Sequence, residues 1–130
     1  MAHDPGALSG DVRAVLVERH LATLTTLRPD GTPHVVAVGF TWDARARLAR
    51  VLTNGASRKV AHVRSGSRRA VVAQVDGSRW LSLEGEPQVS DDPERVAEAV
   101  RRYAERYRVP GVNPERVVIE IAVDRVLGRG

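Results

Sequence analysis

The sequence contains no cysteine, which excludes disulfide bonds, thiolate metal sites and cysteine nucleophiles. Aromatic residues make up only 4% of the chain, so few rings are present that could stack on nucleic-acid bases. No apolar run approaches the roughly eighteen residues that span a bilayer. Residues 1–11 lack the basic and apolar regions of a signal peptide. We therefore expect a cytoplasmic protein with no membrane partner.

Lysine is almost absent as well. Of the twenty basic side chains only Lys59 is a lysine, and all the others are arginines. A net charge of +4 raises the possibility of nucleic-acid binding, but sixteen acidic residues are distributed along the chain and the arginines form no basic block. We therefore expect no nucleic-acid partner.

The turn that carries Lys59, residues 53–59, has the sequence Thr-Asn-Gly-Ala-Ser-Arg-Lys. It lies between an expected strand at 48–53 and a short expected helix from Ser57 to about residue 65. Serine is a good helix N-cap, and free backbone N–H groups at a helix start favour an anion. We interpret this turn as an anion cradle that suits a phosphate group. The alternative is a surface turn in which Arg58 and Lys59 are merely solvated.

Hydrophobic patterning predicts one domain over residues 1–130, with residues 1–8 as a flexible N-terminus. The fold class is mainly β (α+β): a six-stranded antiparallel split β-barrel with peripheral helices, because closure removes exposed strand edges. A doubly wound parallel sheet is disfavoured because tight turns join several of the strands. The expected strands span 20–27, 33–42, 48–53, 70–75, 80–89 and 117–123, and the expected helices span 9–18, 57–65 and 93–107.

Two features of these elements bear on a site. Gly39 interrupts the strand expected at 33–42, where a bulge or a close-packed ligand could sit. On the helix expected at 93–107, Tyr103 and Tyr107 share the apolar face and are expected to pack in the core or at a subunit interface. The opposite face carries arginines that we expect to be solvated, namely Arg95, Arg101, Arg102 and Arg106.

Catalytic residues are not evident from the sequence. No serine has a GxSxG context, and the four histidines fit no metal-ligand spacing, so we assign no metal and leave the catalytic residues unknown. His34 is either a ligand contact or a solvated histidine at a strand end. Arg79 and Trp80 could place a cation and a flat ring beside a planar ligand, although Trp80 could equally pack in the core.

Several motifs in a fixed order resemble one known family. They lie at 20–28, 33–40, 50–53, 57–59, 74–77, 79–85 and 116–120, and include Ser57-Arg-Lys59 and Gln74-Val-Asp-Gly77. The set resembles the pyridoxamine 5'-phosphate oxidase-like superfamily of FMN- and F420-binding split barrels. Within it, the motifs are most similar to those of the actinobacterial deazaflavin-dependent enzymes that reduce biliverdin.

This resemblance implies an oxidoreductase that uses coenzyme F420. Hydride would pass from the reduced deazaflavin to biliverdin, giving bilirubin, or to a related conjugated acceptor. The resemblance also implies a homodimer with cofactor sites at the interface. An FMN-binding oxidase or reductase of the same fold remains an alternative, and so does a non-catalytic carrier of a cofactor or tetrapyrrole.

The resemblance further implies three groups of cofactor-binding residues. A second-strand segment would contact the tricyclic ring, the turn would hold the phosphate, and a third group would form the other wall, possibly across the interface. In that order the groups are His34, Val35, Val36 and Ala37; Thr53, Ser57, Arg58 and Lys59; and Gln74, Arg79 and Trp80.

Overall fold

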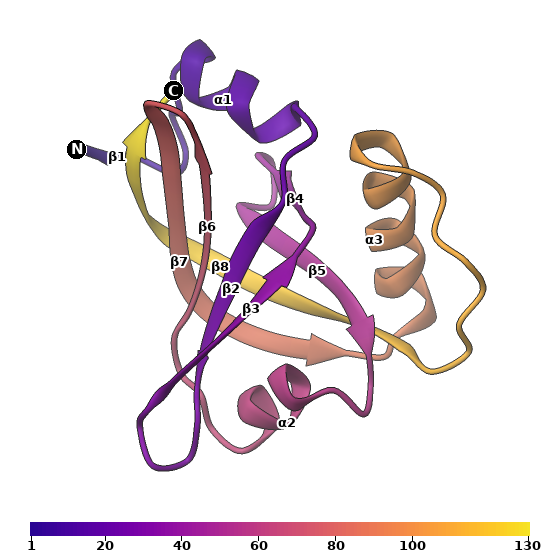
Figure 1. Ribbon diagram of the computed structural model, residues 1–130. Helices are drawn as coiled ribbons and strands as arrows, with labels where there is room; N and C mark the ends of the chain where they lie inside the picture. Colours follow the sequence, from indigo (N-terminus) through magenta and orange to yellow (C-terminus); the bar gives the residue numbers. More distant parts are fainter.

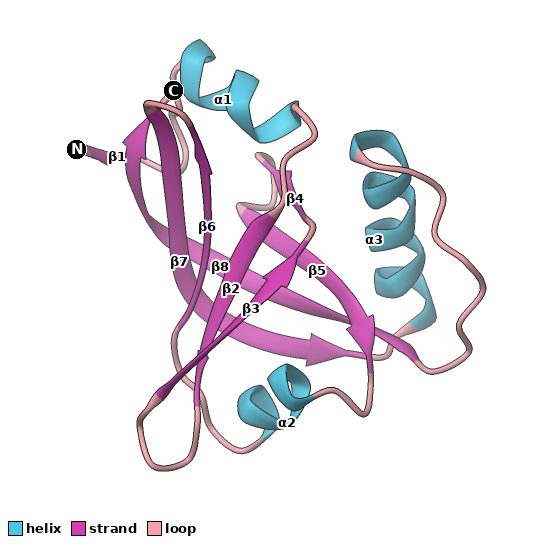
Figure 2. Ribbon diagram, viewed as in Figure 1, coloured by secondary structure: helices cyan, strands magenta, loops and turns pink.

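Eight antiparallel strands form a single curled sheet in the computed structural model, which describes residues 1–130 (Figure 1). The strands are β1 (Ala2–His3), β2 (Ala22–Leu27), β3 (Pro33–Val38), β4 (Phe40–Asp43), β5 (Leu48–Asn54), β6 (Ala70–Asp76), β7 (Arg79–Ser90) and β8 (Arg116–Arg129). Three helices lie around this sheet (Figure 2): α1 (Gly10–Val17), α2 (Arg58–Arg64) and α3 (Pro93–Arg106). None of them is long and apolar enough to cross a membrane.

The order of the strands explains how the barrel closes. Along the sheet the order is β3-β2-β6-β7-β8-β5-β4, and β1 pairs with β8. The two edge strands, β3 and β4, are consecutive in the chain and are separated only by Gly39. The chain itself therefore joins the two edges of the sheet, and the predicted split barrel is confirmed. The prediction of one strand over 33–42 is wrong, and the main path has seven strands instead of six.

The two longest strands, β7 and β8, pair along most of their length and bend together. Their register shifts between Glu84 and Gly85. A Cβ atom on Gly85 would overlap the carbonyl oxygen of Ala122 on β8, so only glycine allows this close approach. Strand β8 is longer than expected, and its end pairs with the N-terminal segment that we expected to be flexible, with Ala2 opposite Leu127.

The core lies inside the curl of the sheet. Alternate side chains of the strands point into it, as Leu81 and Leu83 do on β7 and Ile119 and Ile121 do on β8, and none of these four is exposed. The same period of two places Phe40 in this core at the start of β4. Burying apolar side chains of this size contributes about 1.5–3 kcal/mol each.

Helix α3 packs over the junction between β3 and β4. The rings of Tyr103 and Tyr107 lie 4.8 Å apart, and a Cβ atom on Gly39 would come within 3.2–3.3 Å of both. The interruption of the strand at Gly39 therefore accommodates two tyrosine rings of the chain itself.

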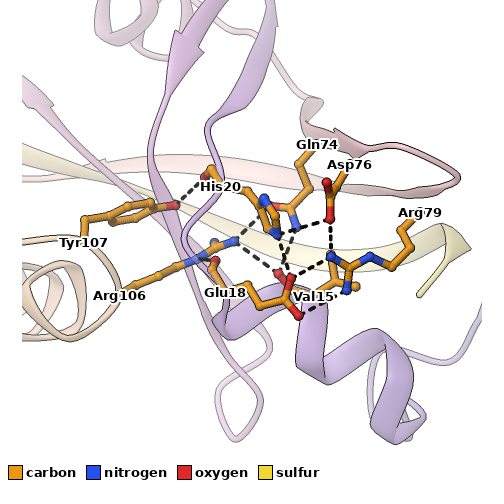
Figure 3. A network of polar contacts seen from close by, with 8 residues as sticks. All are labelled: Val15, Glu18, His20, Gln74, Asp76, Arg79, Arg106 and Tyr107. Carbon is orange, nitrogen blue, oxygen red and sulfur yellow. Dashed lines mark hydrogen bonds and ion pairs between the residues drawn. The ribbon is translucent and has the colours of Figure 1, made fainter.

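The prediction that the arginines of α3 are solvated is wrong for Arg102 and Arg106, which are half-buried, whereas Arg95 and Arg101 are exposed. Arg106 donates to the carbonyl oxygen of Phe40 at 2.7 Å. It also donates to the carbonyl oxygen of Glu18 (2.8 Å) and to the amide oxygen of Gln74 (3.0 Å) (Figure 3). Arg95 binds Glu120 and Arg102 binds Asp43, and only Arg101 bonds solely to neighbours on its own helix. Backbone oxygens at a sheet edge need hydrogen-bond donors, and long arginine side chains reach them.

A cluster of three buried charged side chains connects β4, β5 and β8 where α3 covers these strands. Arg50 donates to Asp43 at 2.8 Å and lies 3.7 Å from Glu120, and all three side chains are at most 9% exposed. Burial opposes ionisation of Asp43, but hydrogen bonds from Arg50 and from the N–H group of Ala46 outweigh it and lower the pKa of this carboxyl group.

We expect Asp43→Asn to lower the free energy of unfolding by about 3 kcal/mol, because it leaves Arg50 buried without its closest counter-charge. Urea unfolding monitored by circular dichroism measures the loss. The control is Glu105→Gln, which removes an exposed i,i+4 partner of Arg101 and should cost less than about 0.5 kcal/mol. Equal losses in the two variants would show that the buried group contributes no more than a surface pair.

Candidate functional site

An open groove of about 260 Å³ lies where β3, the end of β5, α2 and α3 meet. One wall comes from the predicted cradle, one from the end of β3, and one from α3 and the loop that follows it. The lining residues are Ala37, Val38, Gly39, Leu52, Thr53, Asn54, Lys59, Tyr103, Pro110, Asn113 and Arg116.

The cradle is a tight turn held by Asn54. Its side-chain oxygen accepts from the N–H group of Ala56 at 2.9 Å, and its carbonyl accepts from the N–H group of Ser57 at 3.0 Å. Ser57 occupies the N-cap position of α2, as predicted, but its hydroxyl makes no capping hydrogen bond. Instead that hydroxyl accepts from Thr53 at 3.2 Å, so the two hydroxyl groups lie together beside the turn.

The cations of the cradle have no acidic partner. Lys59 is half-buried in the groove wall and forms no ion pair, and burial lowers its pKa. Arg58 is exposed and also unpaired. Elsewhere seven of the nineteen arginines form ion pairs with carboxylates, as Arg69 does with Asp124. Two unpaired cations beside two hydroxyl groups suit an anionic ligand, and this favours a phosphate cradle over a solvated turn.

Strand β3 borders the groove with an edge that pairs with no other strand. Its side chains alternate: Val35 and Ala37 are exposed, and Val36 is half-buried against the core. Of the four β3 residues predicted to bind the cofactor, Ala37 lines the groove.

His34 points toward α2, where its ring packs edge-on against His62 at 4.7 Å. Burial lowers the pKa of His34, and the nearby charges of His62, Arg28, Lys59 and Arg58 lower it further. The imidazole is therefore neutral at pH 7, and it lies close to the cradle without lining the groove.

The third predicted group lies at the other end of the barrel, near α1 (Figures 1 and 3). Gln74 is buried; its amide donates to the carbonyl of Val15 and accepts from the guanidinium of Arg106. Arg79 pairs with Glu18, and Trp80 is 39% exposed at the start of β7. Within one chain these residues do not meet the cradle, so a contact across a subunit interface remains a prediction.

Three potential metal ligands meet beside Arg79. Ligand atoms of Glu18, His20 and Asp76 lie within 4.8 Å of one another. The guanidinium of Arg79 bonds to both carboxylates, and hydrogen bonds from Arg79 and then His20 lower the pKa of Glu18 to about 2. An arginine therefore already supplies the positive charge that this cluster attracts.

The sequence did not reveal every residue of the groove. Asn54 lies within the predicted cradle but was not among the residues expected to bind the cofactor, although its turn-forming character is a signal that could have identified it. Helix α3 and the loop after it fold back over β5, and this brings Tyr103, Asn113 and Arg116 to the groove. No local sequence pattern indicates that packing.

Comparison with known proteins places this fold and groove in a family. The family model described as pyridoxamine 5'-phosphate oxidase matches residues 8–130. The chain belongs to this family. It is also 56% identical, over 98% of its length and 93% of the relative, to the F420H(2)-dependent biliverdin reductase of Mycobacterium tuberculosis (strain CDC 1551 / Oshkosh).

Solved structures of other proteins share the fold at low identity. One named F420 reductase aligns with a TM-score of 0.73 at 22% identity, covering 93% of this chain and 98% of its own. The conserved hypothetical protein Rv2991 of Mycobacterium tuberculosis aligns with a TM-score of 0.77 at 24% identity, covering 95% of this chain and 85% of its own. At these identities the likeness shows the fold alone.

We expect Lys59→Met to leave the free energy of unfolding unchanged or slightly higher, because it removes a half-buried, unpaired charge. Inorganic phosphate should raise the Tm of the unmodified protein and not that of the variant. Differential scanning fluorimetry over a phosphate series checks both statements. Arg45→Met removes another unpaired cation, away from the groove, and should keep the phosphate response. A response retained in Lys59→Met would exclude Lys59 as the anion contact.

Proposed function

We propose that this protein is an F420-dependent reductase that transfers hydride from the reduced deazaflavin to biliverdin, giving bilirubin. The observation that carries the proposal is the 56% identity to a reductase of that name over almost the whole chain. The cradle adds support from the structure, because its half-buried, unpaired Lys59 fits a cofactor that bears a phosphate.

The residues present fit such a cofactor. Thr53 and Ser57 offer hydroxyl groups, Arg58 and Lys59 offer charge, and each charge-assisted contact to phosphate contributes about 1.5–3 kcal/mol to binding. When bound, the cofactor supplies the hydride chemistry itself. The protein then needs to hold donor and acceptor face to face, and positioning alone contributes on the order of 7 kcal/mol or more.

We also propose that the protein acts as a homodimer. The outward-facing side chains along β2, β3 and β6 include no charged residue. Several apolar ones are well exposed, such as Val35 (57%), Leu21 (76%) and Val75 (76%). An uncharged face of this kind is typical of an interaction site. We call it the uncharged sheet face; it comprises Leu21, Thr23, Thr25, Val35, Ala37, Val71, Ala73 and Val75.

The position of this face supports cofactor sites at the interface. Ala37 belongs to the uncharged sheet face and also lines the groove, so a partner docked on the face would border the groove. The partner could then bring Arg79 and Trp80 to a cofactor bound along β3. A cytoplasmic location, with which the lack of cysteine agrees, completes the proposal.

The purified protein should bind F420 selectively over FMN in a fluorescence titration, and the reduced complex should convert biliverdin to bilirubin, seen by absorbance. Lys59→Ala should weaken F420 binding by about 10-fold to 150-fold, the loss of one charge-assisted phosphate contact. Arg45→Ala is the matched control and should bind normally. Selective FMN binding would favour the FMN enzyme, and tight F420 binding without turnover on any conjugated acceptor would favour a carrier.

Thr23→Lys tests the dimer. Thr23 lies opposite Ala37 on β3 and Ala73 on β6, so the substitution places a charge at the centre of the uncharged sheet face. We expect light scattering to give the mass of a dimer for the unmodified protein and that of a monomer for the variant, with weaker F420 binding. Gln88→Lys adds the same charge to an exposed position on β7 and should stay dimeric. A dimeric Thr23→Lys protein would place the interface elsewhere.

A further inference from the structure

Tyr103 and Tyr107 stand one helical turn apart on α3, yet their hydroxyl groups have different surroundings. The hydroxyl of Tyr107 donates to the carbonyl of Phe40 at 2.8 Å and lies 3.1 Å from that of His20, and burial raises its pKa. The hydroxyl of Tyr103 has no hydrogen-bond partner in the chain, and its residue lines the groove. Tyr107 thus anchors the helix, whereas the hydroxyl of Tyr103 is free to meet a ligand.

The ring of Tyr103 is held in place from two sides. On one side the ring of Tyr107 packs against it, with the ring centres 4.8 Å apart and a 40° angle between the planes. On the other side lies Gly39, where a Cβ atom would come within 3.3 Å of the ring of Tyr103. Arg106 fixes this part of α3 by donating to the carbonyl oxygens of Phe40 and Glu18. A phenol held by rigid neighbours is suited to meet a ligand in one orientation.

The proposed reaction creates a need for a proton. Hydride from the reduced deazaflavin forms a new C–H bond on the conjugated acceptor, and the displaced electron pair moves onto an acceptor nitrogen. That nitrogen must take up a proton to complete the reduction. Among the residues that line the groove, Tyr103 is the one with a free O–H group on a fixed ring, whereas Lys59 belongs to the cradle.

We propose that Tyr103 forms one wall of the ligand site and gives its hydroxyl proton to the nitrogen of the reduced acceptor, and this rests on the proposed function. The O–H bond of Tyr103 breaks as the new N–H bond forms. The phenolate then takes a proton from solvent through the open side of the groove. The redox change is confined to the deazaflavin and the acceptor.

Tyr103→Phe tests this role because it keeps the ring and removes only the hydroxyl. We expect the F420 dissociation constant, measured without acceptor, to stay within about twofold. The single-turnover rate of biliverdin reduction should fall about 100-fold, as expected for loss of a positioned proton donor. The solvent deuterium isotope effect on that rate should change as well. Tyr103→Ala, which also removes the wall, should weaken F420 binding in addition.

Tyr107→Phe is the matched control. It removes the hydroxyl one turn away, where Arg106 still donates to the carbonyl of Phe40, and it should keep the rate and the isotope effect. A Tyr103→Phe protein that reduces biliverdin as fast as the unmodified protein would overturn the inference and leave the proposed function intact. Failure of the unmodified protein to bind F420 or reduce biliverdin would overturn both.

Discussion

The structure depends on the close approach of α3 to Gly39. At this residue the two edges of the sheet become one continuous chain, and a barrel that closes in this way leaves backbone carbonyls without strand partners. Arg106 and Tyr107 both supply donors to the carbonyl of Phe40, so the same helix that covers the junction also satisfies it. A side chain larger than hydrogen at position 39 would push the rings and the helix outward. One wall of the groove would move with them, which couples barrel closure to the shape of the site.

Charged side chains are paired where they hold the fold together and unpaired at the cradle. Under α3, Asp43, Arg50 and Glu120 are buried together, where each charge compensates another and connects strands that lie apart in sequence. At the cradle, by contrast, Lys59 is half-buried with no counter-charge, and burial lowers its pKa. An unpaired charge costs stability in the free protein, and an anionic ligand recovers that cost when it binds. The unpaired charge of Lys59 therefore fits the proposed contact to a phosphate.

Much of this architecture could be predicted from the sequence, because it follows from local patterns. Alternation of apolar residues predicted most of the strands, and the Ser57-Arg58-Lys59 turn indicated the cradle. The interruption at Gly39 was also predicted, but the two tyrosine rings that pack there and the role of Arg106 could not be, because each depends on the helix that packs over β4. An arginine on a polar helix face looks solvated until a carbonyl from another element lies within its reach. Tyr103 was predicted to pack, and only the tertiary fold distinguishes its free hydroxyl from the engaged one of Tyr107.

Strand β3 shows how the proposed dimer would bear on the site. One set of its side chains faces the protein interior and the other set lies on the uncharged sheet face, while its unpaired edge borders the groove. A single strand thus faces the core, the proposed partner surface and the groove in three directions. Ala37 belongs to two of these, because it lies on the uncharged sheet face and lines the groove. A small side chain there would let the proposed partner and a ligand approach the same backbone. Assembly and cofactor affinity should therefore depend on each other, although no residue of the cradle lies on the uncharged sheet face.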